Sequence, residues 1–178
     1  MPVQIGAKTH SFSEPTGLLS DCHRRVEMFL GGLKAVSEIA HRPLDEQTRH
    51  SLELALRYFR EAAPKHTADE EVSLFPVLRT LDNDDVKLAL EKISALEEDH
   101  RWAEPLHQRV DELGAKCLQN GSLDEQDAKE FREAIAHLQA MYARHIEIED
   151  KDVFPVAARA LSAEQKARIA AEMAARRR

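Results

Sequence analysis

Residues 66–76 read HTADEEVSLFP, and residues 145–155 read HIEIEDKDVFP. Both segments begin with a histidine, have a glutamate four residues later with a second acid directly after it, and end in Phe-Pro. Side chains four residues apart lie one above the other on a helix face, about 5–6 Å apart at Cβ. The two segments therefore predict two related helices, each presenting an imidazole and a carboxylate on one face.

A shorter repeat surrounds two further histidines. Residues 21–27 read DCHRRVE and residues 98–104 read EDHRWAE, so that His23 and His100 occupy matching positions. The four segments alternate along the chain, which indicates two helical hairpins of similar design in tandem. In an up-down-up-down four-helix bundle the second and fourth helices run parallel on a diagonal. Their His-x-x-x-Glu pairs would then face each other.

Turn signals divide the chain into four long helices. We expect them at about residues 15–41, 46–74, 84–118 and 123–153. Phe75-Pro76 and Phe154-Pro155 are expected to end the second and fourth helices, because a residue before proline avoids helical angles. Pro64 and Pro105 fall inside helices and should kink them.

A short C-terminal helix is predicted after the bundle, because Ser162 to Gln165 have the pattern of a capping box. The predicted fold class is therefore all-α, an up-down-up-down four-helix bundle with a short C-terminal helix. Residues 1–14 are expected to be a flexible arm, residues 15–160 the bundle, and residues 161–178 the C-terminal helix with a basic tail. We expect Arg176 to Arg178 to be a solvated helix end.

Composition narrows the possible partners and the location. The chain has 178 residues, 43% of them apolar and 32% charged, with a net charge of −7. The acidic balance argues against nucleic acid as a partner, since phosphate binding needs a basic face. No apolar run approaches the roughly 18 residues of a membrane span, and residues 1–15 lack a secretory pattern. We therefore expect a cytoplasmic protein with no membrane contact, in which Cys22 and Cys117 are free thiols.

Apolar residues recur at helical spacing in each of the four predicted helices. Polar side chains interrupt these apolar rows near the middle of the predicted bundle. A buried, unpaired carboxylate costs several kcal/mol, so it should be neutralised, paired or bound to a metal. Four histidines and two glutamates in one core have few stable explanations other than a metal. Mixed imidazole and carboxylate ligation suits iron, with zinc and manganese as weaker candidates. The residues concerned are His23, His66, Glu70, His100, His145 and Glu149.

With these motifs, residues 16–160 resemble the hemerythrin family, in its bacterial branch with a histidine-histidine-glutamate (HHE) cation-binding domain. The resemblance implies a non-haem centre of two iron ions with oxo or hydroxo and carboxylate bridges. It implies dioxygen or another small diatomic molecule as the ligand, and names no protein partner. By this match the metal ligands are His23, His66, Glu70, His100, His145 and Glu149.

Two positions differ from the oxygen-carrying hemerythrins. Those proteins have two histidines four apart on the third helix, where this chain has His100 followed by Glu104. Their last carboxylate is an aspartate five residues after its histidine, whereas Glu149 lies four residues after His145. Ligand changes of this kind alter the charge and the redox potential of a metal site. Reversible oxygen carriage is therefore not the expected function.

The favoured interpretation is a metal-binding protein rather than an enzyme, which senses, stores or scavenges oxygen, nitric oxide or iron. The alternative is a di-iron oxidase, a peroxidase or an iron-centre repair protein. A ferritin-like site would instead show Glu-x-x-His, and a purely structural bundle remains the simplest competitor. Glu27 and Glu104 are expected to support the ligands or lie on the surface, and His107 to be hydrogen-bonded in the core.

Overall fold

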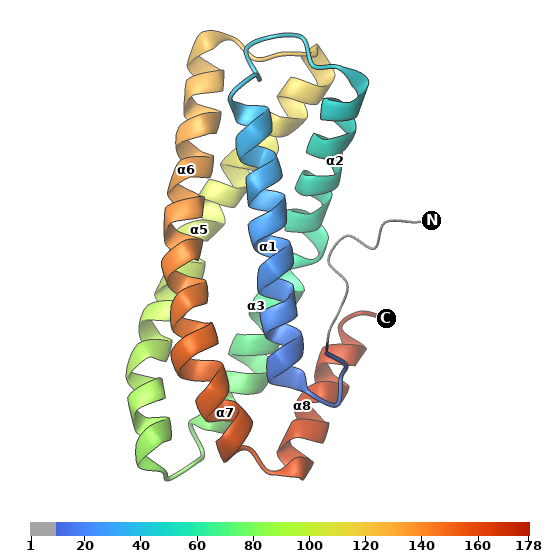
Figure 1. The fold of residues 1–178 in the computed structure, drawn as a ribbon. Coiled ribbons are helices and arrows are strands. Elements are labelled where there is room, and N and C mark those ends of the chain that lie inside the picture. Colours follow the sequence, from blue (N-terminus) through green and yellow to red (C-terminus); the bar gives the residue numbers. More distant parts are fainter. Residues whose placement is uncertain (1–9) are drawn as a thin grey trace. The chain divides into compact units, whose positions relative to one another are not determined.

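The structure, a computed structural model, describes residues 10–178. This part of the chain is helical and contains no strand, which confirms the all-α class (Figure 1). The elements, of which η1 and η2 are π-helices, are α1 (Pro15–Ser37), α2 (Glu46–Glu61), α3 (Ala63–Ala68), η1 (Asp69–Leu74), α4 (Phe75–Leu78), α5 (Asp84–Asn120), α6 (Glu125–Ile148), η2 (Glu149–Val153), α7 (Phe154–Ala160) and α8 (Ala163–Ala175).

The predicted arm of residues 1–14 falls mostly outside the described residues, which begin at His10. The backbone N–H of His10 donates to Asp21 Oδ2 at 2.8 Å, and its ring Nδ1 lies 3.2 Å from Asp21 Oδ1. Its ring also lies where a side chain at Gly17 would be, 2.6 Å from an ideal Cβ there. Residues 10–14 therefore lie against the first turns of α1. Among residues 10–178 no helix is long and apolar enough to cross a membrane.

The chain divides into two compact units, and α1, α3, α5 and α6 contribute residues to both. The first unit contains residues 10–25, Pro64–Glu98 and Arg144–Arg178, and the second contains Val26–Ala63 and Asp99–Ala143. The second unit contains segments of α1, α2, α5 and α6, and successive segments run in opposite directions (Figure 1). The first unit contains segments of α1, of α3 to α5 and of α6 to α7, together with α8. The predicted helical bundle is thus confirmed.

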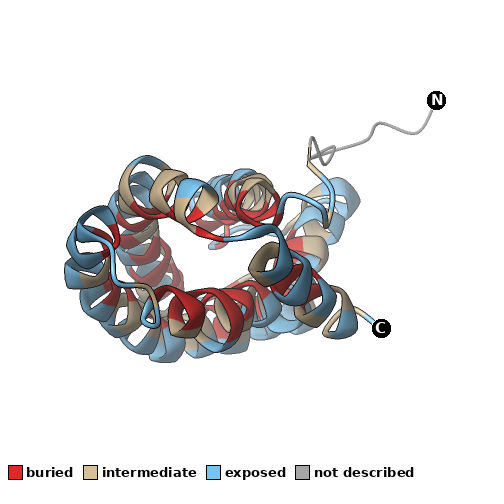
Figure 2. Ribbon diagram, turned by 90° about the horizontal axis from the view of Figure 1, so that it is seen from below, coloured by how far each residue is buried: buried red, intermediate tan, exposed pale blue. Residues whose placement is uncertain are grey.

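The second unit buries apolar side chains from α1, α2, α5 and α6. Their buried faces turn toward the other helices of the unit, as the periodicity predicts (Figure 2). Two backbone hydrogen bonds join its loops, from Leu123 N to Ala40 O at 2.7 Å and from Leu44 N to Gly121 O at 3.0 Å. The largest fully buried side chains here are Leu33, Leu52, Leu56, Leu113 and Phe131.

The first unit has its own apolar core, to which α8 contributes. Phe75 and Phe154, from the two Phe-Pro motifs, are almost completely buried in it. From α8, Ile169 and Met173 join the same cluster. Ser162 caps α8 in the predicted capping box with Gln165. The core thus brings the two Phe-Pro motifs and α8 into one unit. Each Phe-Pro motif directly follows the segment that contains one of the repeated glutamates.

The Phe-Pro motifs do not end their helices, contrary to the sequence prediction. The chain continues through Pro76 into α4 and through Pro155 into α7, in each case after a π-helix. In an α-helix a proline ring clashes with the carbonyl four residues earlier, and the wider π-turn moves that carbonyl away. Near Pro64 a break separates α2 from α3, whereas Pro105 lies inside the continuous α5.

Two further predictions about the helix ends were wrong. The first helix ends at Ser37 rather than near residue 41, because turns with hydrogen bonds from Ile39 to Val36 and from Arg42 to Ile39 replace its last turn. Arg176 and Arg177 are not a solvated helix end, since both guanidinium groups bind the buried Asp69. Only Arg178 of the three is exposed.

Gly114 is required in the second unit by the close approach of α2. A Cβ at this position would lie 2.7 Å from Leu56 Cδ1 and 3.2 Å from its Cγ, and Leu56 is buried. Gly114→Ala is expected to destabilise the protein by about 1–3 kcal/mol, the usual cost of overpacking. Gly31→Ala, whose Cβ would meet nothing within 4 Å, should instead stabilise by up to about 1 kcal/mol through helix propensity. Urea unfolding measures the change in the free energy of unfolding for both variants, and changes of the same sign would contradict this account.

Candidate metal centre

The two repeated glutamates lie at the π-helical turns of the first unit. The backbone N–H of Phe75 donates to the carbonyl of Glu70, and that of Phe154 donates to the carbonyl of Glu149, five residues back in each case. Such wide turns occur mainly as short insertions, frequently at functional sites. Glu70 and Glu149 are both completely buried. The repeat seen in the sequence is therefore also a repeat of backbone geometry.

Three histidines of the first unit meet these carboxylates. Nε2 of His66 lies 3.1 Å from Glu70 Oε1, and Nε2 of His145 lies 3.2 Å from Glu149 Oε2, within each repeat. From α1, His23 Nε2 lies 3.1 Å from Glu149 Oε2 and 3.9 Å from Glu70 Oε1. Ligand atoms of His23, His66, Glu70 and Glu149 all lie within 4.8 Å of one another, and all four residues are buried.

These distances fit the ligands of a metal ion. A histidine nitrogen or carboxylate oxygen binds a first-row metal at about 2.0–2.2 Å, so two ligands at right angles lie about 3.0 Å apart. Within the described residues, neither oxygen of Glu149 makes a hydrogen bond, and neither does Nε2 of His23, although all three atoms are enclosed. Buried polar atoms are nearly always hydrogen-bonded. Their close approach without hydrogen-bond geometry indicates that they converge on a common cation.

The electrostatics of the protein atoms alone lead to the same conclusion. Burial, and then the charge of Glu149, raise the pKa of Glu70 to about 8. Burial also acts to raise the pKa of Glu149, but His145 and His23 outweigh it and hold that pKa below its ordinary value. Two buried carboxylates at this distance repel each other and need positive charge between them. A cation supplies that charge without protonating either ligand.

Asp150 orients the imidazole of His23. Its Oδ1 lies 2.9 Å from His23 Nδ1 and accepts a hydrogen bond from the Ser20 hydroxyl at 2.8 Å. Arg24 donates to its other oxygen at 2.5 Å. An imidazole that donates Nδ1–H to a carboxylate presents Nε2 as a ligand in a fixed direction. On its other side His23 stacks on Phe154, with ring centroids 5.3 Å apart. The sequence showed Asp150 only as the second acid of its repeat.

His100 is the sixth residue of the predicted set. It lies on α5, half buried, in the second unit, whereas the other five belong to the first unit. Its role as a ligand therefore stays a prediction, which rests on its match to His23 in the sequence repeat. Glu27 and Glu104 are both exposed, and so are His41, His50 and His137.

His107 has the hydrogen-bonded position that the sequence suggested. Its Nε2 lies 2.9 Å from the Tyr142 hydroxyl, and its ring stacks on Phe59 with centroids 4.9 Å apart. Burial lowers the pKa of His107 to about 4, so the ring is neutral at pH 7. All three residues lie in the second unit. The arrangement accounts for His107 as part of the packing there.

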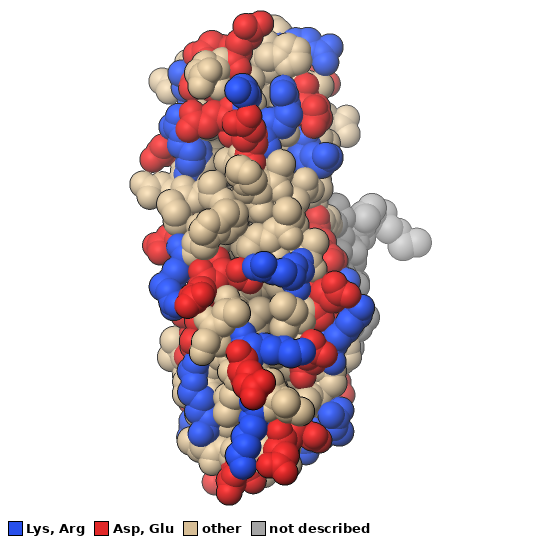
Figure 3. Space-filling view, turned by 90° about the vertical axis from the view of Figure 1, so that its left-hand side faces the viewer, with Lys and Arg blue, Asp and Glu red and all other residues tan. Residues whose placement is uncertain are grey.

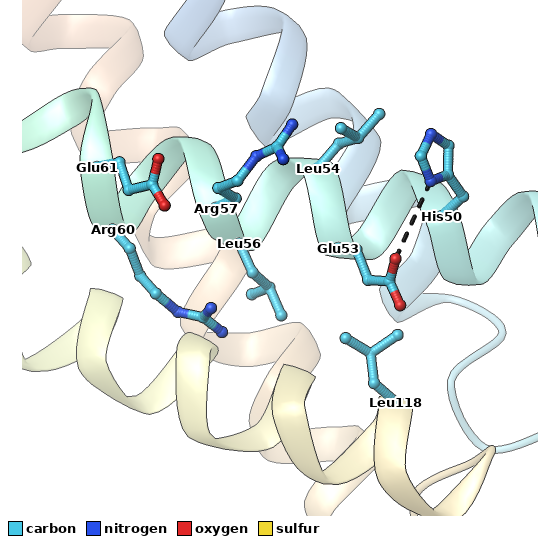
Figure 4. A pocket seen from close by; sticks show the side chains of 8 residues that line it. All are labelled: His50, Glu53, Leu54, Leu56, Arg57, Arg60, Glu61 and Leu118. Atoms are coloured by element: carbon cyan, nitrogen blue, oxygen red, sulfur yellow. Dashed lines mark ion pairs between the residues drawn. The ribbon is translucent and has the colours of Figure 1, made fainter.

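A surface pocket between α2 and α5 in the second unit differs from the buried cluster of histidines and glutamates (Figure 4). Its lining mixes both signs of charge, and His50 lies 4.0 Å from Glu53 across its edge. Arg60, which also lines the pocket, donates a hydrogen bond to Asp111 at 2.6 Å. Basic and acidic side chains also alternate over the surface drawn in Figure 3. The buried cluster of the first unit is therefore the stronger candidate site.

Comparison with known proteins agrees with this geometry. The hemerythrin HHE cation-binding domain matches residues 14–170. The chain belongs to the hemerythrin HHE family. An uncharacterized protein of Haemophilus influenzae (strain ATCC 51907 / DSM 11121 / KW20 / Rd) is 28% identical over 168 residues, covering 94% of this chain and 92% of that protein. The buried cluster of histidines and glutamates in the first unit fits a metal site in such a domain.

The metal-free protein should become less stable as the pH rises from about 6.5 to 8, above the range in which the lowered pKa of His107 acts in the opposite direction. The pKa of Glu70 is raised in the folded state to about 8, so the folded chain keeps a proton that the unfolded chain has already lost. The pKa of His23 is also raised, since Asp150 and the two glutamates outweigh the lowering by burial, and its effect has the same sign. Thermal unfolding after chelation measures this. Glu70→Gln should flatten the dependence, and an unchanged slope would contradict the assignment.

Loss of the Asp150 charge should weaken metal binding while the helices stay intact. Asp150→Asn removes the carboxylate that orients His23, and changes to such supporting groups typically cost about 10–100-fold in metal affinity. Asp152→Asn is the matched control, because Asp152 lies in the same π-helix but pairs with Lys92 at 2.5 Å on the surface. Chelator competition measures both affinities. Equal affinities of the two variants would exclude this role for Asp150.

Proposed function

We propose that this hemerythrin-like protein binds a pair of non-haem iron ions, through which it senses, stores or scavenges oxygen, nitric oxide or iron. The observation that supports this most strongly is the convergence of two buried carboxylates and three imidazoles without hydrogen bonds to the Glu149 carboxylate. The proposed ligands are His23, His66, Glu70, His100, His145 and Glu149.

The repeat supports two ions rather than one. Each half of the chain supplies one His-x-x-x-Glu pair and one further histidine, so that the set divides into two similar halves. Four imidazoles and two carboxylates with two oxygens each offer eight donor atoms, which exceed the six positions of a single octahedral ion. A carboxylate can also bridge two ions. Glu70 and Glu149 are the candidates, since oxygens of both lie within 4.8 Å of the neighbouring imidazole nitrogens.

Iron fits the mixed donor set, and the surroundings fit a small ligand. Imidazole and carboxylate donors suit non-haem iron, and bound iron supplies redox chemistry and coordination positions for diatomic molecules. The chain's part is to orient His23 through Asp150 and to enclose the donors. Phe154 stacks on the His23 ring. Leu74 and Val153, each four residues after one of the two glutamates, are fully buried. Such a site admits oxygen or nitric oxide more readily than a larger molecule.

The number of ions per chain tests this proposal. Anaerobic loading with ferrous iron, followed by elemental analysis, should give close to two ions per chain. Glu70→Ala and Glu149→Ala should each lose metal while helix content by circular dichroism stays similar, because the apolar core is untouched. Glu147→Ala is the control, since Glu147 is exposed and pairs with Lys151 at 2.6 Å.

A ratio near zero for the native protein would refute the function, and a ratio of one would refute the paired site. Full occupancy in both glutamate variants would refute their role as bridges. The loaded native protein should also change its visible absorption on addition of oxygen or nitric oxide. No spectral change with either gas would leave iron storage as the only part of the proposal standing.

A further inference from the structure

A buried aspartate directly precedes Glu70 in η1. Asp69 is completely buried, and both of its carboxylate oxygens bind arginines that follow α8. Arg176 Nη1 donates to Oδ1 at 2.8 Å, and Arg177 Nη2 donates to Oδ2 at 2.5 Å. Charged hydrogen bonds of this kind are short and directional. Two guanidinium groups therefore fix one carboxylate, one residue away from a proposed metal ligand.

Arg176 also binds a second residue of η1. Arg176 Nη2 donates to the Ser73 hydroxyl at 2.7 Å, and Ser73 donates to Glu172 of α8 at 2.5 Å. Asp69 and Ser73 are one turn apart and lie on either side of Glu70 in the chain. Ile169 and Met173 anchor α8 in the core of the same unit. We call Arg176 and Arg177, together with Asp69 and Ser73, the arginine clamp.

The arginine clamp belongs to one of the two repeats only. In the alignment of the repeats, Asp69 matches Ile148 and Ser73 matches Asp152. The hemerythrin HHE match ends at residue 170, before both arginines. The repeat therefore does not account for a buried charge at position 69. An apolar residue, Ile148, suffices at the equivalent position, which is the last residue of α6 directly before η2. A π-helix therefore does not in itself require an aspartate at this place.

A wide turn needs external support to aim a side chain. The π-helix is rare and occurs mostly as single turns, and Glu70 projects from the middle of one. Contacts at Asp69 and Ser73 fix the turn at both of its ends, so that it cannot rotate about its axis or revert to an α-helical turn. Supporting contacts that orient ligands strongly influence metal affinity.

We propose that Arg176 and Arg177 are positioning residues of the metal site, which hold η1 so that Glu70 points into the ligand cluster. The inference rests on the proposed metal binding and extends the site to α8.

Loss of the two positive charges and loss of the positioning of Glu70 predict opposite effects on iron affinity, so a measurement of affinity distinguishes them. Removal of two positive charges near a cation site should strengthen cation binding by electrostatics alone. Loss of positioning should weaken it. We expect Arg176→Ala/Arg177→Ala to bind ferrous iron about 10–100-fold more weakly, measured anaerobically by chelator competition well below the unfolding temperature of the metal-free protein. Arg178→Ala, which removes an exposed arginine at the same helix end, should keep native affinity.

A second variant separates positioning from the compensation of a buried charge. The double variant leaves Asp69 unpaired, which can unfold a protein. Asp69→Ile combined with both arginine changes leaves no unpaired charge at position 69 and copies Ile148 of the other repeat. If the arginine clamp positions Glu70, this triple variant also binds iron weakly. Native affinity in the triple variant would overturn the inference and reduce the clamp to charge compensation.

A measurement without metal distinguishes failure of this inference from failure of the proposed function. Hydrogen exchange of the metal-free protein should be faster over residues 69–78 in both variants, and unchanged over residues 149–160, which serve as the internal reference. Unchanged exchange over residues 69–78 would overturn the inference even if iron binds. Absence of iron binding by the native protein would instead refute the proposed function, while the exchange result would still decide whether the arginine clamp holds η1.

Discussion

The repulsion between two buried carboxylates is the constraint on which the rest of the site depends. Glu70 and Glu149 are removed from water at the level where apolar side chains would otherwise fill the interior. A carboxylate in such surroundings is stable only when protons, hydrogen bonds or cations compensate its charge. The three histidines supply part of the compensation, since the Nε2 atoms of His23, His66 and His145 lie 3.1–3.2 Å from the glutamate oxygens. Cation binding and folding are thus linked, because both depend on how the charges of these two buried carboxylates are compensated.

The sequence predicted the inward-facing positions well, because burial follows the helical period. His66, Glu70 and Leu74 lie at successive turns of one face, and the structure buries all three. The capping box at Ser162 was equally visible, since it depends on four consecutive residues. Local spacing therefore sufficed for the helical class and for the buried faces, and five of the six candidate ligands lie in one unit.

Other features could not be predicted, because they depend on contacts between distant segments or on small changes of backbone pitch. A His-x-x-x-Glu pair looks the same before an α-turn and before a π-turn, so Phe-Pro appeared to end each helix. Asp150 reaches His23 across the first unit, and Arg177 reaches Asp69 from α8. No local pattern marks either pair. His100 shows the remaining gap, because its assignment still depends on the repeat alone.

The π-helical turns also have a consequence for the register of the chain. Each inserts about one extra residue into a helical turn, which shifts the phase of everything that follows by about 100°. Without this shift Phe75 and Phe154 would leave their buried positions when the glutamates kept theirs. The glutamate and the phenylalanine of each motif are therefore compatible only at their present spacing. A lineage that lost one residue between them would have to give up either the ligand or the core, which restricts insertions and deletions in these two short segments far more than substitutions.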